Sequence, residues 1–144
     1  MSETIASMID PGKLPPSLWA DTVEEQPAAP PLEGDADCDL CIVNAGFTGL
    51  SAALHAALEG KTVIVLEASE PGWGASGRNG GEVLPGLKLL PDEIIGKMGS
   101  DVGERMCALA EGGPDLVFEL IERYGIKCEA TRGGWITVLP SNAA

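Results

Sequence analysis

Basic residues, histidine and long apolar runs are all scarce in this chain of 144 residues. Nine lysines and arginines stand against 22 aspartates and glutamates, which gives a formal net charge of −13. Because nucleic acids and anionic membranes are bound through basic patches, this balance argues against both as partners. No apolar run approaches the ~20 residues that span a bilayer, and no apolar leader core stands near the N-terminus. We therefore expect a cytoplasmic protein without a membrane span.

Cysteine is also sparse, and its arrangement favours neither a disulfide framework nor a metal site. Among the four cysteines, Cys38 and Cys41 form a C-x-x-C pair, which can indicate zinc binding or thiol redox chemistry. No second such pair exists, and the one histidine, His55, falls on the predicted solvent face of a helix. The pair lies in a predicted strand, where positions three apart face opposite sides. We therefore interpret both cysteines as structural and predict no metal site.

Residues 1–37 differ in composition from the rest of the chain. They hold more than half of the eleven prolines, and through Asp39 they carry nine acidic residues against one lysine. This composition predicts an acidic, proline-rich tail or linker. Leu14, Leu18 and Trp19 are apolar enough to strap part of it onto the surface of a domain. The remaining chain is expected to fold, because 44% of all residues are hydrophobic.

A β–α–β unit is predicted directly after the tail. The apolar run Leu40–Val43 breaks at Asn44-Ala45-Gly46, which suits a buried strand followed by a tight turn. A helix is then predicted to end at Gly60, because apolar residues recur at helical spacing at Leu50, Ala53, Leu54, Ala57 and Leu58. The continuous run over 62–66 is typical of a parallel strand covered on both faces. The fold class is therefore α/β, with a Rossmann-like β–α–β unit.

Two further helices and one strand are expected beyond this unit. A glycine- and proline-rich loop over 68–91 is too long to be an idle connection. Helical apolar patterns follow over 102–110 and 116–124, with a break at Gly112-Gly113-Pro114, since proline cannot continue a helix from within. Residues 134–139 have the composition of a strand.

The turn after the first predicted strand carries a nearly complete dinucleotide-binding fingerprint. Residues 44–49 stand where G-x-G-x-x-G is expected, between a strand and a helix. Gly46 would let the backbone approach a pyrophosphate, and Gly49 would let the helix pack closely on the strand. Glu67, at the end of the second strand, is placed to accept hydrogen bonds from an adenosine ribose and disfavours a 2′-phosphate. Asn44 replaces the first glycine and adds about 1 kcal/mol of strain.

A second glycine-rich segment, residues 71–81, lies in the long loop. Such a backbone can wrap closely around a ligand, with Arg78 offsetting pyrophosphate charge and Ser76 donating a hydrogen bond to it. The residues alone leave two alternatives open. One is a strand–turn–helix that binds no nucleotide, and the other is a flexible surface loop.

Three segments taken together resemble a known family. Residues 44–53, 65–68 and 72–81 are similar to the N-terminal part of FAD-dependent oxidoreductases of the D-amino-acid oxidase/glycine oxidase superfamily. Within it they most resemble enzymes of the gamma-glutamylputrescine oxidoreductase type, as do residues 17–20 and 83–86. The resemblance implies a flavoprotein, with FAD as its cofactor. Such an enzyme oxidises a small-molecule amine or amino acid to an imine by hydride transfer to the flavin.

The resemblance also implies roles for particular residues. The first motif would hold the FAD pyrophosphate, Glu67 would hold the adenosine ribose, and the glycine-rich loop would line the path towards the ribityl chain and flavin ring. The residues implied as cofactor-binding are Asn44, Ala45, Gly46, Phe47, Thr48, Gly49, Glu67, Ala75, Ser76, Arg78, Asn79 and Gly80. No residue is given a catalytic role.

Members of this family are much longer than the present chain. We therefore expect residues 38–144 to be a partial FAD-binding domain, with the start of the substrate-domain sheet near 128–140. Such a fragment of an amine- or amino-acid-oxidising enzyme is expected to be inactive by itself. The alternative is a non-catalytic nucleotide-binding module, for FAD or NAD, or an interaction module. Asn44, which replaces a family glycine, is expected to weaken FAD binding.

Overall fold

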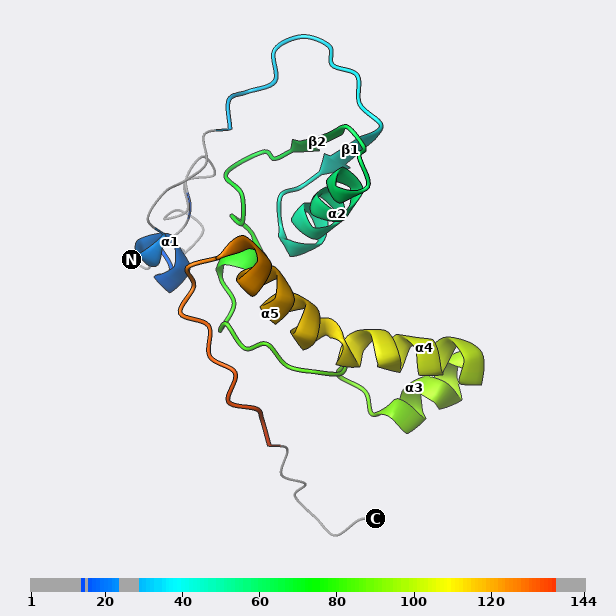
Figure 1. Cartoon of the computed structure of the whole chain (residues 1–144). Helices are drawn as coiled ribbons and strands as arrows, with labels where there is room; N and C mark the ends of the chain where they lie inside the picture. The colour runs from blue at the N-terminus through cyan, green and yellow to red at the C-terminus, as the bar shows by residue number, and fades with distance from the viewer. Residues whose placement is uncertain (1–13, 15, 24–28, 137–144) are drawn as a thin grey trace, which may run out of the picture. The chain divides into compact units, whose positions relative to one another are not determined.

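The computed structural model describes residues 14, 16–23 and 29–136 of the chain (Figure 1). The chain divides into two compact units, and the division falls between Gly80 and Gly81. The first unit contains α1 (Leu18–Thr22), β1 (Leu40–Val43), α2 (Phe47–Leu58), β2 (Val63–Leu66) and the short 3-10 helix η2 (Ala75–Gly77). The second contains α3 (Pro91–Met98), α4 (Ser100–Glu111) and α5 (Gly113–Tyr124). The predicted α/β class is thus observed as a mixed helix and strand fold.

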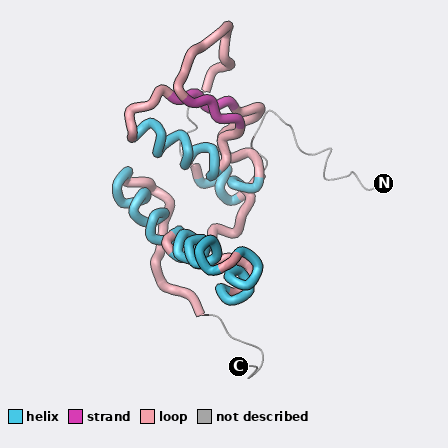
Figure 2. Tube along the Cα trace, turned by 90° about the vertical axis from the view of Figure 1, so that its right-hand side faces the viewer, coloured by secondary structure: helices cyan, strands magenta, loops and turns pink. Residues whose placement is uncertain are grey.

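The first unit is built on the predicted β–α–β unit. Strands β1 and β2 pair in parallel, with Leu40 opposite Val63 and Val43 opposite Leu66. Helix α2 connects the two strands and packs on one side of the pair (Figure 2). The connection therefore places the turn after β1, the start of α2 and the end of β2 at one end of the sheet.

Hydrogen bonds between Asp39 and Thr62 lie at the start of this sheet. The Asp39 carboxylate accepts hydrogen bonds from the amide and the hydroxyl of Thr62, both at 2.8 Å. The hydrogen bond from the Thr62 backbone amide is the main cause that holds the pKa of Asp39 below its ordinary value. Because β1 begins at Leu40, directly after Asp39, Cys38 precedes the strand and Cys41 lies within it. The prediction that both cysteines lie in the strand was therefore wrong for Cys38.

The strands are less covered than their sequence predicts. No residue of β2 is buried, and 79% of the Val43 side chain is exposed in β1. The expectation that the second strand is covered on both faces is therefore wrong for the described part of the chain. The reason is that the sheet there has two strands and α2 lies on one side of them. The one buried apolar side chain in the described part of this unit is Ala45, at the turn.

The second unit consists of three successive helices. Helices α4 and α5 confirm the two predicted helices and the break between them, which falls at Gly112. Helix α3 was not predicted, because no helical pattern was identified between the end of the predicted loop at residue 91 and residue 102. It begins with Pro91, a favoured first residue, and the Glu93 carboxylate accepts a hydrogen bond from the Leu90 amide at 3.0 Å. Gly103 of α4 lies directly against α3, where a side chain would meet the backbone.

The strand predicted over 134–139 is not observed where it can be tested. Residues 134–136 are not in a strand, and residues 137–139 lie outside the described residues. Ile136 is 87% exposed, so its apolar side chain contacts little of the described chain. A β-branched run forms a strand only where a partner strand accepts its hydrogen bonds.

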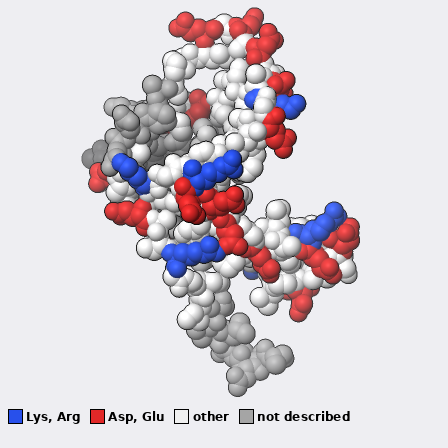
Figure 3. All heavy atoms as spheres, viewed as in Figure 1, with Lys and Arg blue, Asp and Glu red and all other residues white. Residues whose placement is uncertain are grey.

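The surface charge and the lengths of the helices concern the two partners that the sequence argues against, nucleic acids and membranes. Acidic side chains are spread over the visible face, with Lys and Arg side chains interspersed among them (Figure 3). Of the helices that the structure describes, none has the length and apolar character needed to cross a bilayer.

Candidate functional site

The turn after β1 adopts the backbone conformation that a glycine would favour. Asn44 has a φ of +91°, so the left-handed backbone expected at the first fingerprint position is present with an asparagine there. The Asn44 amide still donates to the Leu66 carbonyl at 2.7 Å, which extends the pairing of β1 and β2 by one residue. The chain then turns sharply into α2, whose N-cap is Gly46.

Three consecutive amides at this turn each donate to a side-chain oxygen. The Ala45 amide donates to Glu67 Oε2 at 2.7 Å, and the Gly46 amide donates to Asn44 Oδ1 at 2.7 Å. The Phe47 amide donates to Ser76 Oγ at 3.0 Å. The three oxygens come from the turn, the end of β2 and η2, which are separated in the sequence. Successive backbone amides at a helix N-terminus are donors that bind phosphate groups in many proteins.

Two glycines are required by close contacts at this turn. A Cβ atom on Gly46 would lie 2.9 Å from Ser76 Oγ and 3.0 Å from Asn44 Oδ1. A Cβ atom on Gly49 would collide with the backbone carbonyl oxygen of Asn44 and would lie 3.2 Å from Ile42 Cγ2. Gly49 therefore allows the close contact between α2 and β1 that the fingerprint predicts. Gly46 leaves room for the side chains that reach the start of α2.

Glu67 lies at the end of β2, with its carboxylate directed at the turn. Besides the Ala45 amide, it accepts a hydrogen bond from the Ser69 amide at 3.2 Å. The hydrogen bond from the Ala45 amide is the main cause that lowers the pKa of Glu67. Partial desolvation raises this pKa, and the hydrogen bond from the Ser69 amide lowers it by a smaller amount. An ionised carboxylate has about four acceptor positions, so Glu67 retains capacity for further donors. Its predicted contact with a ribose stays a prediction.

The glycine-rich loop reaches the turn through Ser76. Ala75 and Ser76 lie in η2, and the Asn79 side-chain amide donates to the Ser76 carbonyl at 2.6 Å. The guanidinium of Arg78 lies 4.8 Å from the centre of the Trp73 ring, and its Nε donates to the Gly74 carbonyl. Arg78 thus contacts its own loop, whereas the sequence analysis expected it to face a pyrophosphate. The Trp73 indole Nε1 is buried and has no hydrogen-bond partner in the described part of the chain.

The structure brings some of the predicted residues together and leaves others at the periphery. Direct hydrogen bonds link the turn to both Glu67 and Ser76. No hydrogen bond within residues 29–136 engages the amides of Thr48 and Gly49. Ala75, Arg78, Asn79 and Gly80 lie in or beside the loop that carries Ser76, and all four are exposed.

One residue beside the site was not predicted to lie there. The Trp19 indole Nε1 donates to the backbone carbonyl of Asn79 at 2.9 Å. Trp19 is apolar enough to hold part of the tail on a domain surface, but its sequence context indicates no contact point. No local pattern could supply one, because 60 residues separate the two partners.

The remaining candidates for chemistry lie apart from the turn. His55 is exposed on α2 and its ring pairs with the Ser51 carbonyl at 2.7 Å, which confirms the predicted solvent face. Cys41 is exposed and Cys38 is half-buried. Among the residues that the structure describes, no three potential metal ligands come together.

The chain is similar in sequence to known oxidoreductases. Residues 39–144 match the family described as FAD dependent oxidoreductase (DAO). The chain is 42% identical over 103 residues to gamma-glutamylputrescine oxidoreductase of Escherichia coli, which covers 72% of this chain and 24% of that protein. It is 39% identical over 117 residues to the probable oxidoreductase OrdL of Haemophilus influenzae, covering 81% of this chain and 27% of that protein. No solved structure matches the chain.

A third relative extends the match towards the N-terminus. The probable oxidoreductase OrdL of Rhizobium meliloti is 34% identical over 130 residues, which covers 90% of this chain and 30% of that protein. The chain therefore spans 24% to 30% of the length of these curated relatives.

Proposed function

Because the chain belongs to the family of FAD-dependent oxidoreductases, we propose that its β1–α2 turn and its glycine-rich loop bind FAD. The observation that carries this proposal is the row of three consecutive amides at the start of α2, each donating to a side-chain oxygen. Phosphate oxygens can accept the same hydrogen bonds, and the partial positive charge of the helix N-terminus favours an anion there.

The residues present fit such a cofactor in two further respects. A Cβ atom at Gly46 would meet Ser76 Oγ and Asn44 Oδ1, so glycine leaves room for acceptor oxygens at these amides. The buried indole Nε1 of Trp73 is a donor without a protein acceptor in the described residues, in the loop proposed to line the path to the flavin. We propose that the backbone from Gly46 to Gly49 holds the pyrophosphate, that Asn44 and Ala45 form the turn that places this backbone, and that Glu67 holds the ribose. Ala75, Ser76, Arg78, Asn79 and Gly80 would line that path.

We further propose that the longer protein oxidises an amine or an amino acid. The support is the 42% identity to a relative named gamma-glutamylputrescine oxidoreductase. When bound, FAD supplies the redox chemistry by accepting a hydride as the substrate becomes an imine. Within this chain the turn and the loop bind and orient the cofactor, so the 144 residues alone are expected to be inactive. A small-molecule substrate and a cytoplasmic location belong to the same proposal.

The domain assignment is part of the proposal as well. Residues 38–144 would be a partial FAD-binding domain preceded by the tail 1–37, with the substrate-domain sheet starting near 128–140. In support, large apolar side chains such as Val43 and Leu109 are about four-fifths exposed, as expected for surfaces that other parts of a longer protein cover.

An FAD titration of the 144-residue chain, followed by flavin fluorescence, tests the proposed site. Wild-type protein is expected to bind FAD, and Gly46→Val is expected to abolish binding because its side chain would collide with Ser76 and Asn44. Gly96→Val is the matched control, since a Cβ atom at Gly96 meets nothing within 4 Å. Equal binding by wild type and Gly46→Val would overturn the site. Displacement of FAD by an equal concentration of NAD would overturn the choice of cofactor.

A further inference from the structure

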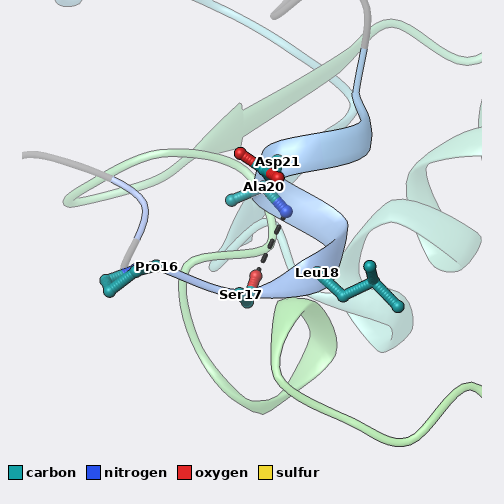
Figure 4. Close-up of a pocket in the computed structure, with 5 residues that line it drawn as sticks. All are labelled: Pro16, Ser17, Leu18, Ala20 and Asp21. Atoms are coloured by element: carbon teal, nitrogen blue, oxygen red, sulfur yellow. Dashed lines mark hydrogen bonds between the residues drawn. The ribbon is translucent and has the colours of Figure 1, made fainter.

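Helix α1 attaches the segment before β1 to the glycine-rich loop. Ser17 begins the helix, and its Oγ accepts a hydrogen bond from the Ala20 amide at 3.1 Å (Figure 4). Trp19, in the first turn of this helix, is 37% exposed. The Trp19 indole N–H donates to the Asn79 carbonyl at 2.9 Å.

Three hydrogen bonds connect Trp19 with the start of α2. The first joins the Trp19 indole to the Asn79 carbonyl. The second joins the Asn79 side-chain amide to the Ser76 carbonyl at 2.6 Å, and the third joins Ser76 Oγ to the Phe47 amide at 3.0 Å. Asn79 therefore accepts a hydrogen bond from Trp19 and donates one to Ser76, and Ser76 in turn accepts one from the Phe47 amide at the start of α2.

We propose that Trp19 is a positioning residue for the cofactor loop, acting through its indole N–H. The inference rests on the proposed function, because the loop's role in FAD binding is itself proposed. A loop rich in glycine loses much conformational freedom when it becomes ordered around a ligand. By fixing Asn79 before the ligand arrives, Trp19 lowers that cost and so raises affinity. The segment before β1 thereby becomes part of the cofactor site.

The alternative for Trp19 is that its ring merely covers the surface. Trp19→Phe separates the two, since phenylalanine keeps an aromatic ring and removes the N–H donor. Trp19→Ala removes both the ring and the donor. Trp135→Phe is the matched control, because Trp135 lies in the second unit and is 53% exposed.

Two measurements on the 144-residue chain test the proposal. The first is trypsin cleavage after Arg78, the residue before Asn79, followed by mass spectrometry without FAD. Cleavage after Lys61, an exposed site in the same unit, is the internal control. The second is FAD affinity from a fluorescence titration. For Trp19→Phe we expect cleavage after Arg78 to accelerate about fivefold and FAD affinity to fall about fivefold, as for the loss of one hydrogen bond.

Each outcome decides for or against the proposal. Selective acceleration at Arg78 with weaker FAD binding, absent in Trp135→Phe, supports it. Equal acceleration at Arg78 and Lys61 means a general loosening of the unit and overturns it. So does wild-type FAD affinity in Trp19→Phe, or a weakened affinity without faster cleavage at Arg78. If the wild-type chain itself fails to bind FAD, the proposed function is overturned, and the cofactor role of Trp19 is overturned with it.

Discussion

Replacing Asn44 by glycine should tighten FAD binding with little change in stability. Asn44 has a φ of +91°, and its Oδ1 accepts the hydrogen bond of the Gly46 amide at 2.7 Å. The side chain therefore has two opposite effects on the free protein. It strains the backbone of the turn, and it accepts the hydrogen bond of the Gly46 amide, which is then not available to a phosphate.

The magnitudes of these effects can be estimated from the geometry. A non-glycine residue in a left-handed conformation costs about 1 kcal/mol, and one intramolecular hydrogen bond contributes about 1 kcal/mol net. Asn44→Gly relieves the first and loses the second, so the free energy of unfolding should change by less than about 1 kcal/mol. FAD no longer has to displace Oδ1 from the Gly46 amide, which favours binding by about 1 kcal/mol, or about fivefold in Kd.

A comparison with Asn44→Ala separates the two causes. Alanine also frees the Gly46 amide, but it keeps a Cβ atom in the left-handed conformation and so should be about 1 kcal/mol less stable than wild type. If occupancy of the amide limits affinity, both variants bind FAD more tightly. If strain alone limits it, only the glycine variant does. FAD titrations and urea unfolding of the three proteins give the answer, and equal or weaker binding by both variants would refute the reasoning.

Two further changes test the contacts that shape the site. Gly49→Ala should destabilise the fold by about 1–3 kcal/mol in urea unfolding, because its Cβ collides with a backbone carbonyl and not with a movable side chain; Gly96→Ala, in open space, should not destabilise, and equal losses would contradict the contact. Glu67 has a lowered pKa, so its ionised form stabilises the fold above the ordinary glutamate pKa, and this contribution is lost as pH falls through the lowered value. Glu67→Gln should therefore flatten the decrease in thermal stability below about pH 4.5, and an unchanged pH profile would argue against the Ala45 bond.

The β–α–β unit was predictable because its signals are local. Apolar spacing placed α2, the run after Gly60 placed β2, and Gly112 placed the break between α4 and α5. Helix α3 was missed because it is only eight residues long and contains Gly96, so its apolar periodicity is short. The predicted strand over 134–139 failed for the opposite reason, since strand formation depends on a partner that local sequence does not reveal.

The site was predictable in composition and unpredictable in its contacts. The fingerprint indicated Gly46, Gly49 and Glu67, because a tight turn, a close helix contact and an acid after the second strand are spaced regularly. The Phe47–Ser76 bond spans 29 residues and the Trp19–Asn79 bond spans 60, and no periodicity encodes either. The assignment of Arg78 to the pyrophosphate rests on charge alone, and no sequence pattern indicates that its guanidinium lies over the Trp73 ring.

The acceptors at the turn suggest how the proposed site tolerates the absence of its ligand. The first amides of a helix have no acceptor within the helix, so other acceptors take the place of an anion in the free protein. Asn44 Oδ1 and Ser76 Oγ are such substitutes, and each can leave by rotating one side chain. The Glu67 carboxylate is different, because it carries charge and also accepts from Ser69. Because Glu67 would repel a pyrophosphate, the ligand would replace the two neutral oxygens as acceptors. We therefore expect binding to break the hydrogen bonds of Asn44 Oδ1 and Ser76 Oγ to the turn and to leave the Ala45–Glu67 hydrogen bond in place.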